Sequence, residues 1–136
     1  MPSFVGVANL TDSLYALKTV VFEEKRLTLR EMTEVCRKNF EGQEVLRQYL
    51  LNKLPKYGND LDEVDELFRE ITEFIVRECR KYTPVFQNAH LVPSVFCWVM
   101  HDRFGRETGA TPDGRSACFP LGDGSGACQG RERNGP

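Results

Sequence analysis

The chain has 136 residues, with 18 basic and 20 acidic side chains and a formal net charge of −2. A domain of this size can bury most of its apolar surface, whereas so balanced a charge gives no electrostatic footprint for nucleic acid or for a membrane surface. The longest apolar run, near 91–100, is far shorter than the roughly 20 residues that a membrane helix needs.

The first segment predicts a strand followed by a helix. Residues 4–7 read as the end of a buried strand. Thr11 or Asp12 would then cap a helix that continues to about residue 25. Apolar residues recur along it with helical spacing, which predicts an inner face made of Leu14, Leu17 and Val21, with the stem of Lys18 beside them.

Two shorter helices follow. Thr28 and Glu31 form a capping box, in which each side chain satisfies a free amide of the other residue, so a helix is expected over about 28–39. Its inner residues would be Leu29, Met32, Val35 and Cys36. A third helix is expected over about 43–53, with Leu46, Tyr49 and Leu50 turned inward, and Pro55 and Gly58 break the pattern after it.

The longest predicted helix covers about 61–82. Asp60 and Glu63 read as a second capping box, and Thr83-Pro84 ends the helix because proline disfavours the α region in the residue before it. One helical stripe runs along it, made of Val64, Leu67, Phe68, Ile71, Ile75 and Cys79. Beyond it, the apolar residues within 91–102 do not alternate with polar ones, which predicts a strand buried on both faces.

The segment 105–136 holds eight of the eleven glycines and is too rich in glycine and proline to form a core of its own. Residues 111–114 predict a type I turn, with proline, aspartate and glycine at the positions that favour them. Asp113 and Arg115 would clamp this turn to its neighbours. Anion binding by the glycine-rich backbone is the alternative, and we favour the clamp because no phosphate-loop motif precedes a helix.

Other patterns that resemble functional sites have simpler explanations. Asp60, Asp62 and Asp65 resemble a calcium loop, but the places of its required Gly and Glu hold Asp65 and Ile71. Acidic residues at a helix N-terminus, favoured by the helix dipole, explain the group better. His90 and His101 are expected to be hydrogen-bonded structural residues.

The five cysteines include no CxxC pair, which favours a reducing compartment over a disulfide framework or a zinc site. No basic region followed by an apolar stretch opens the sequence, so no secretory signal is recognised. We therefore expect a cytoplasmic protein. Cys97 is expected to be a buried, inert thiol, and Cys118 and Cys128 to be more exposed.

Three blocks of the sequence, in the same order, resemble the glycyl radical enzymes, the pyruvate formate-lyase superfamily. The first runs from Gly6-Val7-Ala8-Asn9 to Lys25, and the second from Lys56 to Asp65. The third is the glycine-rich run from Gly109 to Pro136. The motif residues carried over, all with a structural role, are Gly58, Asn59, Asp60, Gly109, Thr111, Pro112, Asp113, Gly114 and Arg115.

The resemblance implies an α/β fold. The chain would be a partial piece of a ten-stranded barrel, mostly helical, with one or two strands and a long glycine-rich C-terminal loop. It would form one partial domain over 1–136, in which 1–104 supplies a helical crossover plus a strand and 105–136 supplies the loop. Two or three positions of the segment 120–124 are closer to the dehydratase and decarboxylase-like branch than to formate acetyltransferase.

The resemblance also implies a reaction. Enzymes of this family carry a glycyl radical, installed by an activating enzyme that uses S-adenosylmethionine and an iron–sulfur cluster. The radical takes hydrogen from a cysteine, and the resulting thiyl attacks a small metabolite, cleaving a C–C, C–O or C–N bond in anaerobic metabolism. The family's cysteine motif (GCxE-like) and radical glycine motif (RVxGY-like) are both absent from this sequence.

We therefore expect a fragment that is inactive alone, with no catalytic residue and no cofactor or metal ligand of its own. Its partners would be the rest of the parent enzyme and the activating enzyme, with a homodimer at full length and no nucleic acid or membrane. The alternative is a non-catalytic interaction module that completes or regulates a split glycyl radical enzyme.

Overall fold

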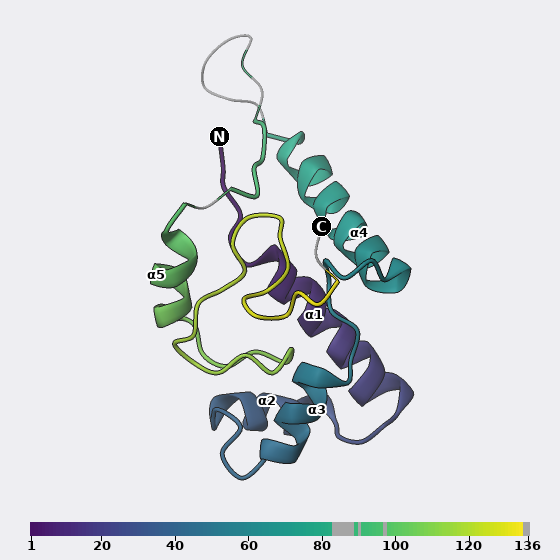
Figure 1. Cartoon of the computed structure of the whole chain (residues 1–136). Coiled ribbons are helices and arrows are strands. Elements are labelled where there is room, and N and C mark those ends of the chain that lie inside the picture. Colours follow the sequence, from purple (N-terminus) through teal and green to yellow (C-terminus); the bar gives the residue numbers. More distant parts are fainter. Residues whose placement is uncertain (83–88, 90, 97, 135–136) are drawn as a thin grey trace.

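The computed structural model describes residues 1–82, 89, 91–96 and 98–134, and it is mostly helical (Figure 1). No helix in this part of the chain has both the length and the apolar character to cross a bilayer. The elements in chain order are α1 (Val7–Leu17), the π-helix η1 (Lys18–Glu23), α2 (Leu29–Arg37), α3 (Glu44–Asn52), α4 (Asp62–Cys79) and α5 (Met100–Glu107).

Helix α1 runs through the middle of the molecule and begins earlier than predicted (Figure 1). Gly6 caps it in the left-handed conformation with φ 78°, which glycine adopts without a Cβ penalty. The predicted cap at Thr11 or Asp12 is wrong, as is a strand over 4–7. Thr11 instead lies inside the helix and donates its hydroxyl to the carbonyl of Val7 at 3.0 Å.

The buried face of α1 also differs from the prediction. Leu14, expected inside, is 40% exposed, whereas Asn9 and Asp12 are almost completely buried. Leu17 and Val21 do pack against the core as predicted. The spacing of apolar residues therefore predicted the buried face correctly only at the C-terminal end of the helix. At its N-terminal end, polar groups of the C-terminal segment cover the helix and bury polar side chains instead.

The helix predicted to reach residue 25 is divided in the structure: α1 ends at Leu17, and the π-helix η1 continues it to Glu23. In its wider turn the amide of Glu24 donates to the carbonyl of Thr19, five residues back, at 2.8 Å. Val20 is completely buried there. The widened turn thus brings Val20 into the core while the chain turns toward α2.

Six buried residues from α1, η1, α2, α3 and the loops after α2 and α3 form the hydrophobic cluster: Ala16, Val20, Met32, Phe40, Leu50 and Leu54. Val35, Cys36, Leu46 and Tyr49 pack around it, as their predicted inward faces required. Leu29 is an exception, since it is 49% exposed. The capping box is confirmed, with the amide of Glu31 donating to Thr28 Oγ1 at 3.2 Å and the amide of Thr28 donating to Glu31 Oε2 at 2.7 Å.

Helix α4 packs against α1, and both lie side by side in Figure 1. Its predicted stripe is buried or half-buried along its length. The predicted capping box at Asp60 and Glu63 is wrong, because Leu61 is the capping residue and no side chain caps the helix. Asp65, inside the helix, instead binds the segment before it, accepting from the amides of Gly58 and Leu61 at 3.1 Å each.

A strand within 91–102 is also wrong for the described residues. Ser94 makes one parallel bridge with Ser3, and α5 begins at Met100. Pro93 lacks an amide donor, which weakens a ladder here. The predictions for His90 and Cys97 fall outside the described residues. Four side chains of this segment, Val92, Phe96, Trp98 and Val99, are more than half exposed, and we call them the apolar patch.

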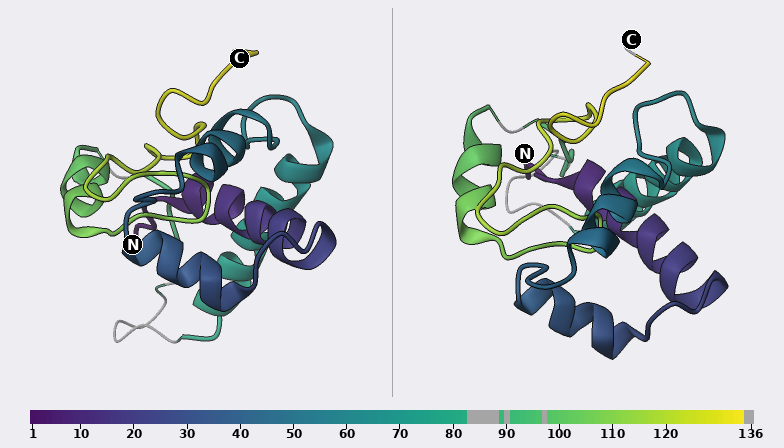
Figure 2. Two further views of the ribbon diagram at one scale, coloured as in Figure 1. Left: turned by 90° about the horizontal axis from the view of Figure 1, so that it is seen from below. Right: turned by 60° about the horizontal axis from the view of Figure 1, so that its bottom comes forward.

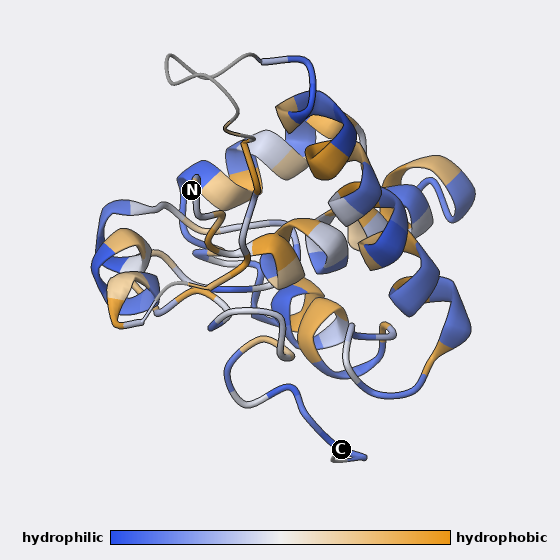
Figure 3. Ribbon diagram, turned by 90° about the horizontal axis from the view of Figure 1, so that it is seen from above, coloured by the Kyte–Doolittle hydropathy of each residue, from blue (hydrophilic) through white to orange (hydrophobic). Residues whose placement is uncertain are grey.

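The predicted irregular tail is confirmed from residue 108, since the described residues 108–134 contain no helix or strand, while 105–107 belong to α5. This tail crosses α1 in all views (Figure 2). It buries Leu121 against Gly6, where an added Cβ would lie 3.3 Å from Leu121 Cδ1. The helices themselves alternate hydrophilic and hydrophobic residues, as helices packed on one side do (Figure 3).

Candidate functional site

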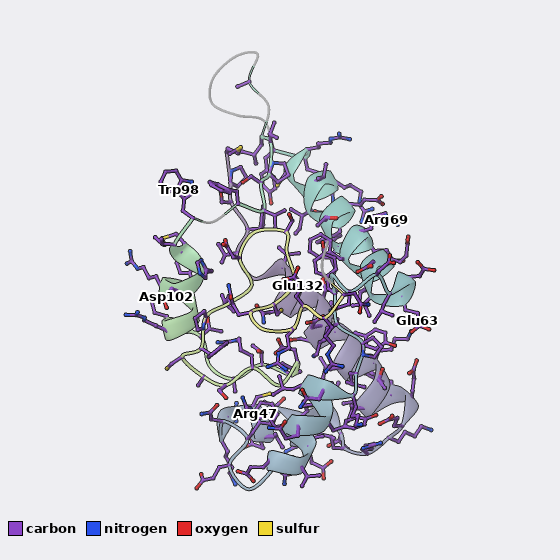
Figure 4. All side chains as sticks on the ribbon, viewed as in Figure 1. Arg47, Glu63, Arg69, Trp98, Asp102 and Glu132 are labelled. Carbon is purple, nitrogen blue, oxygen red and sulfur yellow. The ribbon has the colours of Figure 1, made fainter. Side chains whose placement is uncertain are left out.

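The turn at 111–114 lies over α3. The amide of Gly114 donates to the carbonyl of Thr111 at 3.0 Å, as a β-turn requires. Gly114 has φ +94°, and a Cβ there would lie 2.8 Å from Leu51 Cγ. Both facts demand glycine, because an L side chain is strained at this φ and has no space. The turn is thereby pressed onto α3, beside Arg47 (Figure 4).

Asp113 is the centre of the turn's contacts and is 4% exposed. Its Oδ2 accepts from Asn9 Nδ2 on α1 at 2.8 Å. Its Oδ1 accepts from the Thr111 hydroxyl at 2.5 Å and from the amide of Arg115 at 3.2 Å. A buried carboxylate with both oxygens occupied ties the turn to a helix more than a hundred residues away in sequence.

Arg115 is equally buried and uses its whole guanidinium on the loop itself. Its Nε donates to the Thr111 hydroxyl at 3.2 Å and its Nη1 to the carbonyl of Phe119 at 2.5 Å. Its Nη2 donates to the carbonyls of Thr108 and Gly109. Burial lowers the pKa of Arg115 and the neighbouring Asp113 raises it. The planar fork thus closes residues 108–119 into a compact loop.

Asp12 brings a second buried carboxylate into this region. Its Oδ1 accepts from the amide of Tyr57 at 2.8 Å, while its Oδ2 has no hydrogen-bond partner in the described structure. Burial raises the pKa of Asp12 to about 6, against the opposing positive charge of Lys56. Lys56 is itself buried and donates to the main-chain carbonyl of Asp113 at 2.9 Å.

The remaining neighbour is Cys128, which is 6% exposed, so its predicted exposure is wrong. Burial and the charge of Asp12 raise the pKa of its thiol. We call the six buried side chains of this region the polar cluster: Asn9, Asp12, Lys56, Asp113, Arg115 and Cys128. It joins α1, the segment before α4 and the tail.

Three members of the polar cluster carry atoms of the kinds that bind metal ions. One oxygen of Asp12, one of Asp113 and the sulfur of Cys128 lie within 4.8 Å of one another. The two carboxylates already face the cations Lys56 and Arg115, and both Asp113 oxygens accept hydrogen bonds. The thiol also holds its proton strongly. The donor set suits a charge-balanced network better than a cation.

The second motif, at 58–60, contacts the end of the tail. Asn59 is buried, with its Nδ2 donating to the carbonyl of Arg131 at 3.0 Å and its Oδ1 accepting from the amide of Arg133 at 2.6 Å. Gly58 approaches the tail so closely that an added Cβ would lie 3.0 Å from that of Ala127. Asp60 is exposed. Of the motif residues, therefore, Asp60 and the half-buried Pro112 lie outside these contacts.

The described thiols lie in settings of different burial, and none has the sequence context of the family's radical cysteine. Burial raises the pKa of Cys36 to about 11, and Cys79 is buried. Cys118 is exposed and, like the others, lacks the flanking residues of the family's cysteine motif. His101 is hydrogen-bonded as predicted, with Nδ1 donating to the carbonyl of Trp98 at 2.9 Å.

Sequence reasoning did not select Asn9, Asp12, Lys56 or Cys128 as site residues. All four stand inside the three blocks that carry the family resemblance, and this was the available signal. Asp12 was assigned to a helix cap, and Cys128 had no flanking motif. Their roles depend on contacts across the whole chain, which local patterns do not reveal.

Comparison with known proteins gives a consistent result. Isethionate sulfite-lyase from Bilophila wadsworthia is 40% identical over 98% of this chain, which spans 16% of that protein. Trans-4-hydroxy-L-proline dehydratase from Clostridioides difficile is 35% identical over 97% of this chain and 17% of its own length. The chain therefore spans about a sixth of these relatives.

Among solved structures, the B12-independent glycerol dehydratase from Clostridium butyricum, in its glycerol-bound form, matches 99% of this chain and 17% of its own. The TM-score is 0.92 at 41% identity. A glycyl radical enzyme from Archaeoglobus fulgidus matches 96% of this chain with a TM-score of 0.87 at 31% identity. The sequence model of the pyruvate formate lyase-like family matches residues 1–105. The chain belongs to the pyruvate formate lyase-like family, as its three motif blocks indicate.

Proposed function

We propose that this chain forms one segment of a glycyl radical enzyme of the dehydratase or lyase branch, which cleaves a C–C, C–O or C–N bond in a small metabolite. The observation that carries the proposal is the match of its backbone to glycerol dehydratase over 99% of the chain. In this reading the chain is a partial piece of a ten-stranded α/β barrel, and the thiyl cysteine and glycyl radical come from other segments.

The segment's own task is to hold the glycine-rich loop in one path. Asp113 and Arg115 clamp the loop at one end, and Asn59 binds the tail at the other. Correct placement of rigid loops is what radical transfer between a glycine, a cysteine and a substrate requires, since small displacements of reacting groups cost large factors in rate. The chain binds no cofactor in this proposal.

A graft tests the proposal. The matching segment of glycerol dehydratase is replaced by this chain, and glycyl radical content and glycerol turnover are measured after treatment with the activating enzyme. We expect the radical signal and measurable turnover. The same graft with Asp113→Ala should lose both, and one with Asp60→Asn should keep both. A soluble graft that carries the radical without turnover contradicts the proposal.

The chain alone should show no turnover and no doublet in electron paramagnetic resonance after the same treatment. Such a doublet on Gly126 or a neighbour would overturn the assignment of the radical to another segment.

An interaction module that completes a split enzyme is the second candidate. The extensive exposure of the apolar patch favours a chain that docks onto further protein. Adding this chain in trans to glycerol dehydratase that lacks the matching segment separates the two. Restored turnover in trans supports the module, and turnover restored only by the covalent graft supports the segment.

A further inference from the structure

A pocket of about 160 Å³ lies between the turn at 111–114, α3 and the end of the tail. Its lining includes one carboxylate, Asp113, and four cationic side chains from four separate parts of the chain, namely Arg47, Lys56, Arg115 and Arg131. Leu51 and Phe119 supply apolar wall. A second pocket beside it shares Lys56 and Arg131.

Two of these cations are already balanced. Lys56 lies in the field of the buried Asp12, and Arg115 in that of the buried Asp113. Each buried carboxylate thus has one buried cation for itself. This arrangement leaves nothing to neutralise the other two cations from inside the polar cluster.

Arg47 and Arg131 are the remaining pair. Neither forms an ion pair with any carboxylate in the described part of the chain. Both are half-buried at the pocket. Four cations and the carboxylate of Asp113 line the pocket, so the lining carries excess positive charge. An added anion would neutralise part of that excess.

Main-chain contacts orient both guanidinium groups. Arg47 Nε donates to the carbonyl of Gly114 at 3.0 Å. Arg131 Nη1 lies 3.5 Å from the carbonyl of Leu51 and from Asn52 Oδ1. These contacts occupy Nε of Arg47 and Nη1 of Arg131, so each group keeps further N–H donors for a ligand. A guanidinium held in this way binds carboxylate, phosphate or sulfonate oxygens in pairs.

We propose that this pocket binds a small oxyanion between Arg47 and Arg131. The volume suits a phosphate, sulfate or short organic acid, since sites for drug-sized ligands begin at about 300 Å³. The apolar wall at Leu51 and Phe119 favours an anion that carries a short carbon chain over a bare inorganic ion. The site is separate from the proposed catalytic function and does not depend on it.

Binding of labelled phosphate and of labelled sulfate to the full chain, measured by equilibrium dialysis, tests this site. We expect saturable binding that increasing chloride weakens. Arg47→Gln and Arg131→Gln should each weaken it by about tenfold or more, because each removes one of the two charged forks. Arg30→Gln, on the exposed face of α2, is the matched control and should bind as the parent chain does. Competition by acetate and propionate measures the contribution of the apolar wall.

Circular dichroism of each variant confirms that the helices are intact before binding is compared. A second readout is the shift of the Gly114 and Ser116 amide signals in nuclear magnetic resonance spectra on adding phosphate, with Thr28 as a distant reference. Absence of saturable binding overturns the proposal. Equal weakening by Arg30→Gln, or no weakening by Arg47→Gln and Arg131→Gln, overturns it as well.

Discussion

The hydrophobic cluster and the polar cluster hold opposite ends of α1 by different physics. The hydrophobic cluster collects residues that lie between positions 16 and 54 of the chain. The polar cluster joins Asn9 to Asp113, 104 residues apart. Apolar burial is non-directional and tolerates changes of shape, whereas a buried charge needs its partner in place. The packing of the C-terminal end of α1 is therefore determined by residues nearby in sequence. The packing of its N-terminal end is determined only when the tail is in place.

The largest expected effect is at the polar cluster. Asp113→Ala should lower the free energy of unfolding by about 3–5 kcal/mol. It leaves the main-chain amide of Arg115 and Asn9 Nδ2 without their acceptor, and it removes the negative charge beside the buried Arg115 guanidinium. Urea unfolding followed by circular dichroism measures the change, with Asp60→Asn as control, because Asp60 is exposed and asparagine tolerates its φ of 58°. A loss below about 1 kcal/mol would mean that the clamp is a consequence of the fold and not a cause of it.

A similar truncation in the hydrophobic cluster should cost slightly less. Leu50 is completely buried, and Leu50→Ala should destabilise the chain by about 3 kcal/mol through the lost burial and the cavity left behind. Val45→Ala on the same helix is the control, since Val45 is 87% exposed.

Hydrogen exchange separates the two ends further. Asp113→Ala should release the amides of Gly114 and Arg115 before those of α3, and Leu50→Ala should release α3 first. The same order of release in both variants would show that the clusters unfold as one unit.

The pH dependence of stability probes the polar cluster alone. The pKa of Asp12 is raised from 3.8 to about 6, so its contribution is complete below the lower value and is lost as pH rises through 6. The loss should be about 2–3 kcal/mol. The difference in unfolding free energy between the parent chain and Asp12→Asn, measured from pH 4 to 7, should follow this curve. A flat difference would show that Asp12 ionises normally.

The smallest effect is expected between the clusters, where α1 meets α4. The Tyr15 hydroxyl donates to Glu63 Oε2 at 2.6 Å, and Tyr15→Phe should cost about 1 kcal/mol. Tyr49→Phe removes a comparable but more exposed bond to Glu24 and should cost less. An equal loss of stability in both variants would show that burial does not strengthen the hydrogen bond between Tyr15 and Glu63. Thermal unfolding of both variants in parallel resolves the difference.

The same contrast explains which parts of the fold the sequence predicted. Helical periodicity placed α2, α3 and α4 within a few residues, and the Thr28 capping box marked one start to the residue. These features depend on neighbours three or four positions away. Gly109 to Arg115 predicted a turn and its two clamping side chains for the same reason.

The failures depend on distant partners. Leu14 was assigned to the core and Asp12 to a helix cap, because nothing nearby shows that Lys56 and the tail surround α1. The strand near Ser94 failed because a strand needs neighbours, and the described residues supply one bridge. The left-handed helix cap at Gly6 could not be predicted, because Leu121, which lies beside it, is distant in the sequence. Such contacts are invisible to any local pattern.

Asn59 has a consequence for how this chain can vary. Its side chain contacts the carbonyl of residue 131 and the amide of residue 133, and its own carbonyl accepts from Asn134 Nδ2 at 2.8 Å. The first two contacts are made to main-chain atoms, so they do not depend on which side chains the tail carries. The tail can therefore exchange the side chain of Glu132 freely, while Asn59 has no substitute that both donates and accepts at that reach. The carboxamide of Asn59 thus supplies the loop's main chain with a donor and an acceptor, as a neighbouring strand does in a sheet.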